Sequence, residues 1–315
     1  MITHKCDCAV LLIAFNRPEN TQKVLNEILK SNPRIVYVSI DGPRNNNLND
    51  KVNCQEVRDI VEKTLCNSLT KYKILFQEEN LGCKMGVYSA ISWFFKNETE
   101  GIILEDDTLP NSSFFKFCEQ MLVMYRNNTS IGMVCGSNLI KETYSNKSSY
   151  FFSKQTPIWG WATWKRVWEK YDINMNHWDQ SISKFKSVPS IFNYREKLWN
   201  SIFLKVLSNQ IDTWDYQWTF SFWKNNLLSI VPKINLVKNI GFDENATHTK
   251  HDEPLFVKKS ITTEIVFPLV HPSSIIINKK FDLLVERHIY NITLKCYIKN
   301  QIVNIISKLK IYKNG

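Results

Sequence analysis

Residues 101–107 read Gly-Ile-Ile-Leu-Glu-Asp-Asp, so a short apolar run leads directly into three carboxylates. Such a run is typical of a strand that is buried on both faces of a parallel sheet. Adjacent carboxylates repel one another, and a hard divalent cation such as Mn²⁺ or Mg²⁺ relieves that repulsion by binding their oxygens. The triplet alone is also compatible with a solvated acidic turn. Its position at the end of a buried strand favours a metal site.

On both sides of this stretch, strand-like runs alternate with helical patterns over the first 135 residues. The strands are predicted at 8–14, 35–40, 72–77, 101–104 and 131–135, and the helices at about 16–29, 50–69, 82–96 and 112–126. This alternation predicts an α/β fold with a mostly parallel sheet covered by helices, in which ligands bind beyond the carboxyl ends of the strands. Asn16, which is also predicted to cap the first helix, Asp41 and the acidic triplet all follow such ends. We expect them to meet in one crevice.

From about residue 136 the pattern becomes irregular and aromatic. Most of the ten Trp residues lie between 159 and 223, helices are predicted near 164–171, 190–208 and 214–225, and a strand-like stretch covers 228–237. Aromatic rings can stack on the apolar face of a sugar, so Trp159, Trp161 and Trp214 are candidates for acceptor binding. A packed aromatic core would explain the same residues.

Basic residues and one acidic side chain near the strand ends are candidates for ligand binding. Arg17 and Lys84 suit a diphosphate, although each is also an ordinary surface charge. Asp41 could accept hydrogen bonds from a base or ribose, or it could simply form the turn before residues 42–43.

Asp215 is the candidate general base. It lies among bulky aromatic residues, whose bulk would partly desolvate the carboxylate and raise its pKa toward the useful range; a helix cap is the alternative. His248 lies in a polar loop and, taken alone, resembles an ordinary surface histidine.

Composition excludes little. The 315 residues carry a formal charge of +10, with 43% hydrophobic and 22% charged residues, which suits a phosphate-bearing ligand or an anionic membrane as well as nucleic acid. The basic residues are dispersed and no nucleic-acid reader motif occurs, so no nucleic-acid partner is expected. The first apolar run is too short for a signal peptide or a membrane span, which favours a cytoplasmic location. The eight cysteines include no Cys-x-x-Cys pair, and we expect them to be reduced thiols rather than a zinc site.

Seven segments in this order resemble GT-A glycosyltransferases, and more closely the relatives of the Golgi N-acetylglucosaminyltransferase I. They are VLLIAFNRPENTQKVL, VSIDG, NLGCKMGVYSAI, IILEDDTLPNSSFFKF, GWATWKRVW, TWDYQW and NIGFDENATHT, and they cover about Val10 to Thr249. The resemblance implies a GT-A, Rossmann-like fold and a metal-dependent, inverting transfer from a nucleotide-sugar, with UDP as the expected nucleotide and a hexose or N-acetylhexosamine as the sugar. The acceptor implied is a hydroxyl of a glycan or of a lipid-linked sugar.

The same resemblance implies roles for individual residues. Asp107 would bind the metal, with His248 near it and the diphosphate. Glu105 and Asp106 would contact the ribose and nucleotide. Arg17 and Asp41 would bind the base end, whereas Lys84 stands where the Golgi enzyme has a different basic residue. Asp215 would be the catalytic base.

A catalytic domain is expected over 1–255, followed by a basic, amphipathic, helical appendage over 256–315. Residues 279–315 carry eight Lys or Arg against two acidic residues, and Ile298, Ile302 and Ile305 recur at helical spacing. Such a helix can lie at the inner face of an anionic membrane or dock on protein.

Two other functions remain open. A sugar-1-phosphate nucleotidyltransferase shares the core but usually has a Gly-rich loop early in the chain, where this sequence has Phe15 to Pro18. The second alternative is an inactive, membrane-interacting protein on the same fold.

Overall fold

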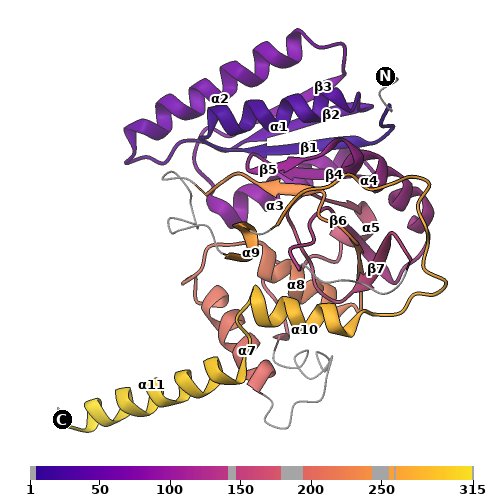
Figure 1. Ribbon diagram of the computed structural model, residues 1–315. Coiled ribbons are helices and arrows are strands. Elements are labelled where there is room, and N and C mark those ends of the chain that lie inside the picture. Colours follow the sequence, from indigo (N-terminus) through magenta and orange to yellow (C-terminus); the bar gives the residue numbers. More distant parts are fainter. Residues whose placement is uncertain (1–4, 141–146, 179–193, 243–254, 259, 314–315) are drawn as a thin grey trace.

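The computed structural model describes residues 5–140, 147–178, 194–242, 255–258 and 260–313 (Figure 1). An eight-stranded sheet forms the centre, in the order β3-β2-β1-β4-β8-β6-β9-β7. Its strands are β1 (Ala9–Ala14), β2 (Ile35–Ile40), β3 (Tyr72–Phe76), β4 (Glu100–Glu105), β6 (Ile131–Cys135), β7 (Tyr150–Ser153), β8 (Trp161–Trp164) and β9 (Leu228–Pro232).

The first half of the sheet is wholly parallel. β3, β2, β1 and β4 pair in register, so that Leu12 of β1 lies between Val38 of β2 and Leu104 of β4. The helices that connect or follow these strands are α1 (Pro18–Lys30), α2 (Leu48–Cys66), α3 (Gly82–Asn97) and α4 (Ser112–Tyr125). α1 and α2 lie together on one face of this half, and α3 lies on the other (Figure 1). The predicted α/β class and the strand–helix alternation are confirmed.

The second half is mixed. β8 runs antiparallel between β4 and β6, β9 is parallel to β6, and β7 is an antiparallel edge strand. The single strand predicted over 228–237 is wrong. The chain instead leaves the sheet after β9 and forms β10 (Val237–Asn239), which pairs antiparallel with β5 (Thr108–Pro110). This ribbon returns the chain to the acidic triplet that ends β4.

The aromatic residues of the second half form a core. Trp161 stacks on Trp214 at a ring-centroid distance of 5.6 Å and also lies against Trp218; all three are buried. The helices around this core are α5 (Lys165–Trp168), α7 (Tyr194–Leu207) and α8 (Asp215–Lys224). They confirm the three helices predicted from the irregular region, although α5 is only one turn long.

The segment after residue 255, predicted as an appendage, contains α9 (Leu255–Lys258), α10 (Lys279–His288) and α11 (Leu294–Lys313). α10 packs on β7, and its Phe281 and Val285 belong to the same hydrophobic core as the sheet. α11 contacts α7 at its start and then projects away from the body (Figure 1).

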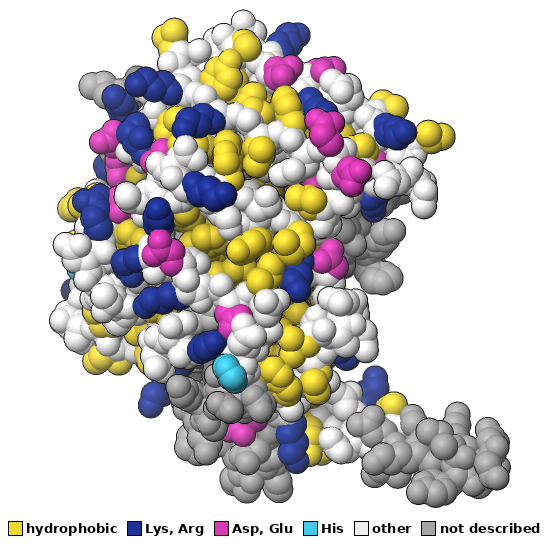
Figure 2. Space-filling view, turned by 180° about the vertical axis from the view of Figure 1, so that it is seen from behind, with side chains coloured by type: hydrophobic (Ala, Val, Ile, Leu, Met, Phe, Trp, Pro, Cys, Tyr) yellow, Lys and Arg dark blue, Asp and Glu magenta, His cyan; other side chains and the backbone are white. Residues whose placement is uncertain are grey.

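Two surface properties bear on partners. No helix in the covered ranges has both the length and the apolarity to span a membrane. Figure 2 shows Lys and Arg side chains scattered over one face with Asp and Glu among them, rather than gathered in a single basic patch.

Candidate active site

The carboxyl ends of the parallel strands line a cavity of about 610 Å³. This volume falls within the range of small-molecule sites. Phe15 to Arg17 follow β1, Asp41 follows β2, Gln77 follows β3, and the acidic triplet ends β4, while Ile211 to Tyr216 enclose the opposite side. The predicted crevice, with Asn16, Asp41 and the triplet in it, is therefore confirmed.

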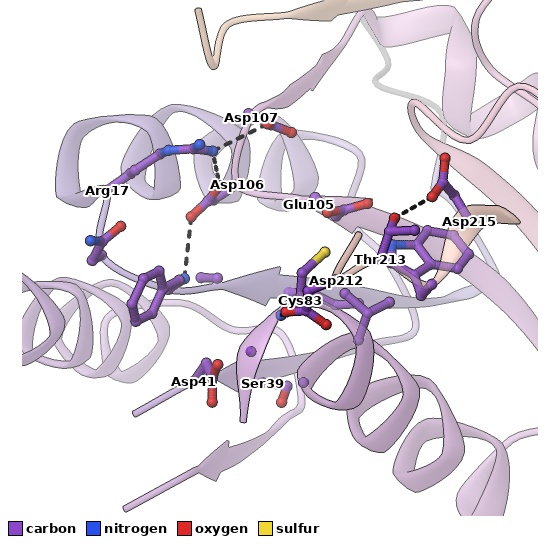
Figure 3. A pocket seen from close by; sticks show the side chains of 18 of the residues that line it. Arg17, Ser39, Asp41, Cys83, Glu105, Asp106, Asp107, Asp212, Thr213 and Asp215 are labelled. Atoms are coloured by element: carbon purple, nitrogen blue, oxygen red, sulfur yellow. Dashed lines mark hydrogen bonds and ion pairs between the residues drawn. The ribbon is translucent and has the colours of Figure 1, made fainter. Parts of the chain in front are cut away.

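Arg17 joins the two aspartates of the triplet. Its Nη1 donates to Asp106 Oδ1 at 3.0 Å and to Asp107 Oδ2 at 3.1 Å, and all three side chains are largely buried. Asp106 also accepts a 3.2 Å bond from the backbone N–H of Phe15. Arg17 thus lies beside Asp106 and Asp107 at the acidic end of the cavity (Figure 3), and its contact with the base end of a nucleotide stays a prediction.

The triplet carries more negative charge than Arg17 neutralises. Burial, more than any charge, raises the pKa of each of the three carboxyls, and that of Asp106 rises to about 6. For Glu105 the charges of Asp107, Asp106 and Asp215 raise the pKa further. Among the residues that the structure covers, no side chain or backbone donor bonds the Glu105 carboxylate, which points to the side of the cavity where Asp215 lies (Figure 3).

Asp41 orders the loop between β3 and α3. Its carboxylate accepts from the backbone N–H groups of Gly42 and Leu81, both at 2.9 Å, and from Asn80 Nδ2 at 3.0 Å. Burial raises the pKa of Asp41, and these backbone bonds partly oppose that effect. Both interpretations of Asp41 therefore agree with its position: it fixes a turn, and it lines the cavity.

Two residues at this end were missed in the sequence: Arg44, which lines the cavity, and Asp50, which lies behind Asn16 and does not line it. Asp50 accepts from Asn16 Nδ2 at 2.7 Å and from Arg44 Nη2 at 2.9 Å, and the Arg44 guanidinium lies 5.5 Å from the centre of the Phe15 ring. Because Asn16 is engaged in this way, it does not cap α1, whose N-cap is Arg17 without a side-chain bond. Asp50 is buried inside α2, and only the fold brings it to β1.

Asp212 is a second residue that sequence reasoning missed. It accepts from the backbone N–H of Cys83 at 3.0 Å and of Lys84 at 3.2 Å, and so caps the first turn of α3 from a distant loop. Gly82, the first residue of α3, has φ +76°, and a β-carbon there would lie 2.8 Å from Asp212 Oδ2. Since the N–H groups of Cys83 and Lys84 are satisfied by Asp212, these two are not available to a phosphate. The sequence Asn80-Leu81-Gly82 at the start of α3 predicts a turn, but it gives no indication that Asp212 bonds to the helix.

Asp215 occupies the first position of α8 and is half-buried on the cavity wall. The N-cap residue of α8 is Trp214, so the alternative role of Asp215 as a helix cap is wrong. Thr213 Oγ1 donates to Asp215 Oδ1. The charge of Asp215 contributes to the raised pKa of Glu105 and of Tyr171. Asp215 and the triplet therefore share one electrostatic environment.

The remaining candidates divide. Trp159 is half-buried and lines the cavity, and buried Trp214 reaches its wall. Trp161 is 1% exposed inside the sheet and does not line the cavity, so its expected contact with an acceptor is wrong. The Lys84 side chain is also outside the cavity wall, although its backbone adjoins it. His248 lies outside the described residues.

The ribbon of β5 and β10 positions Asp107 from the other side. The backbone N–H of Ile240 donates to Asp107 O at 2.7 Å, and a β-carbon on Gly241 would lie 2.6 Å from Asp107 Oδ2. Glycine is therefore needed at 241 for the backbone to pass this carboxylate. The contact places the chain that leads to residue 243 directly against Asp107.

Asp107 and the neighbouring carboxylates are the residues of this cavity that could hold a hard divalent cation. Carboxylate oxygens are the ligands that Mn²⁺ and Mg²⁺ prefer, and a buried acidic triplet with one arginine has charge left to neutralise. Asp107 is 23% exposed at its side chain, against 8% for Asp106, and so is the more accessible of the two aspartates. A cation held there would leave positions for the oxygens of a diphosphate.

No family model and no curated protein matches the chain. Several solved structures are similar to it at low identity. S. aureus TarS 1-349 is 11% identical with a TM-score of 0.40, over 75% of this chain and 61% of that one. The inositol-1-phosphate CTP transferase from T. maritima is 12% identical with a TM-score of 0.31, over 53% and 74%. A UDP-glucose pyrophosphorylase complexed with UDP-glucose is 10% identical with a TM-score of 0.29, over 52% and 78%. Similarity at this level assigns no residue role and no reaction to this chain.

Proposed function

We propose that this chain is a metal-dependent GT-A glycosyltransferase that transfers a sugar from a nucleoside-diphosphate sugar, with UDP as the expected nucleotide, to a hydroxyl group. The observation that carries the proposal is the position of Asp215, which lies across one cavity from the acidic triplet at the carboxyl ends of the parallel strands. That arrangement separates a general base from an electrophilic, cation-binding end, as a single displacement at an anomeric carbon needs.

The residues take the following roles in this proposal. Asp107 holds the divalent cation, which supplies Lewis-acid neutralisation of the leaving diphosphate. Arg17 keeps Asp106 and Asp107 in place and adds positive charge at the same end. Asp41, Asn80 and Arg44 surround the end that would receive the nucleoside.

Asp215 acts on the acceptor in the reaction step. Its carboxylate removes the proton of the acceptor hydroxyl as that oxygen attacks the anomeric carbon. The bond from the anomeric carbon to the diphosphate oxygen breaks, and the nucleoside diphosphate leaves with its electron pair. The single displacement inverts the anomeric configuration. Trp159 and Trp214 would offer ring surface to a glycan or lipid-linked acceptor.

A sugar-1-phosphate nucleotidyltransferase would use the same cavity, and product analysis distinguishes the two reactions. The proposed enzyme releases a nucleoside diphosphate from a nucleotide-sugar, whereas the alternative releases pyrophosphate from a nucleoside triphosphate and a sugar 1-phosphate. The first βα turn, Phe15-Asn16-Arg17, carries three side chains at the cavity wall and no glycine. This composition favours the glycosyltransferase.

The test is a panel of nucleotide-sugars incubated with Mn²⁺, with nucleoside diphosphate and pyrophosphate quantified by ion-pair chromatography. We expect nucleoside diphosphate from one donor class, and its loss in Asp215→Asn with donor binding retained. Asp172→Asn, which changes an aspartate bound to Lys224 outside the cavity, is the matched control. Pyrophosphate release without donor cleavage would support the nucleotidyltransferase. The absence of both nucleoside diphosphate and pyrophosphate would support an inactive protein.

We also propose that α11 binds an anionic membrane surface, where a lipid-linked acceptor would be found. Leu294, Ile298 and Ile302 follow one another at a spacing of four and are 40%, 49% and 51% exposed. Five lysines and no acidic residue occur from 289 to 315, at 295, 299, 308, 310 and 313. Exposed apolar side chains beside lysines match an interfacial helix.

Sedimentation with vesicles tests this surface. We expect binding to vesicles that contain phosphatidylglycerol, weak binding to phosphatidylcholine alone, and loss of binding in the triple variant Leu294→Ser, Ile298→Ser and Ile302→Ser. Equal binding to both vesicle types would contradict the proposal. So would a dimer in solution that the same triple variant dissociates, because a second copy would then cover this face.

A further inference from the structure

Two cysteines and a glutamate lie close together at the amino-terminal end of β1, whereas the cavity lies beyond its carboxyl end. Cys6 precedes β1, Cys8 directly adjoins its first residue, and Glu119 lies in α4. The two sulfurs and a carboxylate oxygen all lie within 4.8 Å of one another. Cys6 is fully buried, Cys8 is 8% exposed and Glu119 is half-buried.

We propose that Cys6, Cys8 and Glu119 bind a thiophilic divalent cation, zinc foremost, which ties the amino-terminal end of β1 to α4. Thiolate sulfur and carboxylate oxygen are both common zinc ligands, at about 2.3 Å and 2.0–2.2 Å. Tetrahedral geometry then places ligand atoms about 3.5–3.8 Å apart. The observed limit of 4.8 Å is longer than this, so the three ligand atoms would have to move closer together to bind the ion.

The backbone around the three residues is already fixed. The N–H of Cys6 donates to Ser31 O at 3.0 Å, and the carbonyl of Cys8 accepts from the N–H of Arg34 at 3.1 Å. The N–H of Asp7, between the two cysteines, donates to Glu119 Oε1 at 2.7 Å. This last bond orients the carboxylate toward the Cys6–Cys8 segment, as an outer hydrogen bond typically does for a metal ligand.

Cys6 and Cys8 are buried beside the half-buried Glu119 carboxylate, so a cation held between them would be partly shielded from water. Zinc binding replaces the two thiol protons, which pass to solvent, with bonds from sulfur to the metal.

A Cys6–Cys8 disulfide is the competing use of the same thiols. All eight cysteines are free thiols in the structure. The cation site has no bearing on transfer chemistry, because it lies at the amino-terminal end of β1 whereas the cavity lies beyond its carboxyl end. The two proposals can therefore fail independently.

The experiment uses the full chain without an affinity tag, purified with a reducing agent. Elemental analysis should find close to one zinc per chain, and replacement by Co²⁺ should give the near-ultraviolet absorption of a cobalt–thiolate bond. Cys6→Ser and Cys8→Ser should each lose both signals, and Glu119→Gln should weaken zinc binding at least tenfold. Cys66→Ser, which changes an exposed thiol, should keep both signals.

Three results would overturn the proposal. One is a cobalt spectrum of the unaltered protein that lacks thiolate absorption. This result is decisive even if the serine variants do not fold. Another is zinc that is retained equally by a folded variant lacking both Cys6 and Cys8. The third is a Cys6–Cys8 disulfide in a non-reducing peptide map of freshly purified protein.

Discussion

The carboxylate of Asp212 accepts a hydrogen bond from the backbone N–H of Cys83, which lies 129 positions earlier in the chain. The contact joins the loop that leads into α8, where Asp215 is the first residue, to the first turn of α3. Two walls of the cavity that are remote in sequence are thereby held in one arrangement, and the position of the proposed base depends on it.

Removing the contact between Asp212 and Cys83 should lower kcat as well as the unfolding free energy. Asp212→Ala deprives α3 of its cap, which costs about 1 kcal/mol of unfolding free energy. We expect kcat to fall by about tenfold as well, because a small misplacement of a catalytic group strongly lowers the rate. Denaturant unfolding and steady-state kinetics measure the two effects. Asn278→Ala, which uncaps α10 away from the cavity, should lose similar stability with unchanged kcat. Equal kcat in the two variants would show that Asp212 has only a structural role.

A single methyl group at residue 241 should impair cation binding. The β-carbon of Gly241→Ala would lie 2.6 Å from Asp107 Oδ2 and 2.7 Å from Asp107 Cβ, so the aspartate has to move. We expect Mn²⁺ affinity, measured by calorimetry, to fall by at least tenfold while the fold is kept. Gly86→Ala, whose β-carbon would lie 3.3 Å from Asp41 Oδ2, is a matched change elsewhere on the cavity wall. Unchanged Mn²⁺ affinity in Gly241→Ala would argue against Asp107 as the ligand.

Loss of Arg17 should make the protein more dependent on a cation. Arg17→Gln leaves Asp106 and Asp107 largely buried without their shared positive charge, which should lower the unfolding free energy by roughly 3–5 kcal/mol at pH 8. Mn²⁺ should then raise the melting temperature more than it does for the unaltered protein. Arg34→Gln, which removes an ion pair with Glu98 outside the cavity, should not change the response to Mn²⁺. Identical Mn²⁺ shifts in all three proteins would contradict this prediction.

Asp282 should stabilise the folded protein at low pH rather than at neutral pH, which is the reverse of the usual effect of a carboxylate. Burial raises its pKa from 3.8 to about 6, although Ser153 Oγ donates to it. A carboxyl whose pKa is raised by folding stabilises the folded state at low pH, and this contribution disappears as the pH rises through about 4 to 6. Asp282→Asn should therefore gain about 2–3 kcal/mol over the unaltered protein at pH 7.5 and almost nothing at pH 4. Thermal unfolding across this range is the measurement. An advantage that does not vary with pH would contradict the prediction.

Most of the parallel half of the fold could be predicted from the sequence, because its strands are continuous apolar runs separated by amphipathic helices. β1, β2 and β4 lie within one or two residues of their predicted limits. The strands that were missed are short and depend on their neighbours. β8 is four residues long and exists because β4 and β6 pair with it on either side.

The site divides in the same way. The triplet, Asp41 and Arg17 were predictable because each follows a strand that ends at one edge of the sheet. Asp50 and Asp212 were not, because a helix and a distant loop bring them to that edge. Trp161 was misjudged because a tryptophan in a turn-like segment and one in a buried strand have the same local sequence signal. The sequence predicted reduced thiols and no zinc site, because the cysteines are dispersed. Only the packing of α4 brings Glu119 beside Cys6 and Cys8, and the proposed cation site rests on that contact.

Thermal unfolding with nucleotide-sugars tests the central proposal most directly. A ligand that binds only the folded state raises the melting temperature by mass action. We predict a shift with UDP-sugars that requires Mn²⁺ or Mg²⁺, disappears with EDTA, and is absent in Asp107→Asn. No shift with any nucleotide-sugar, at any metal concentration, would contradict a nucleotide-sugar-dependent enzyme at this cavity.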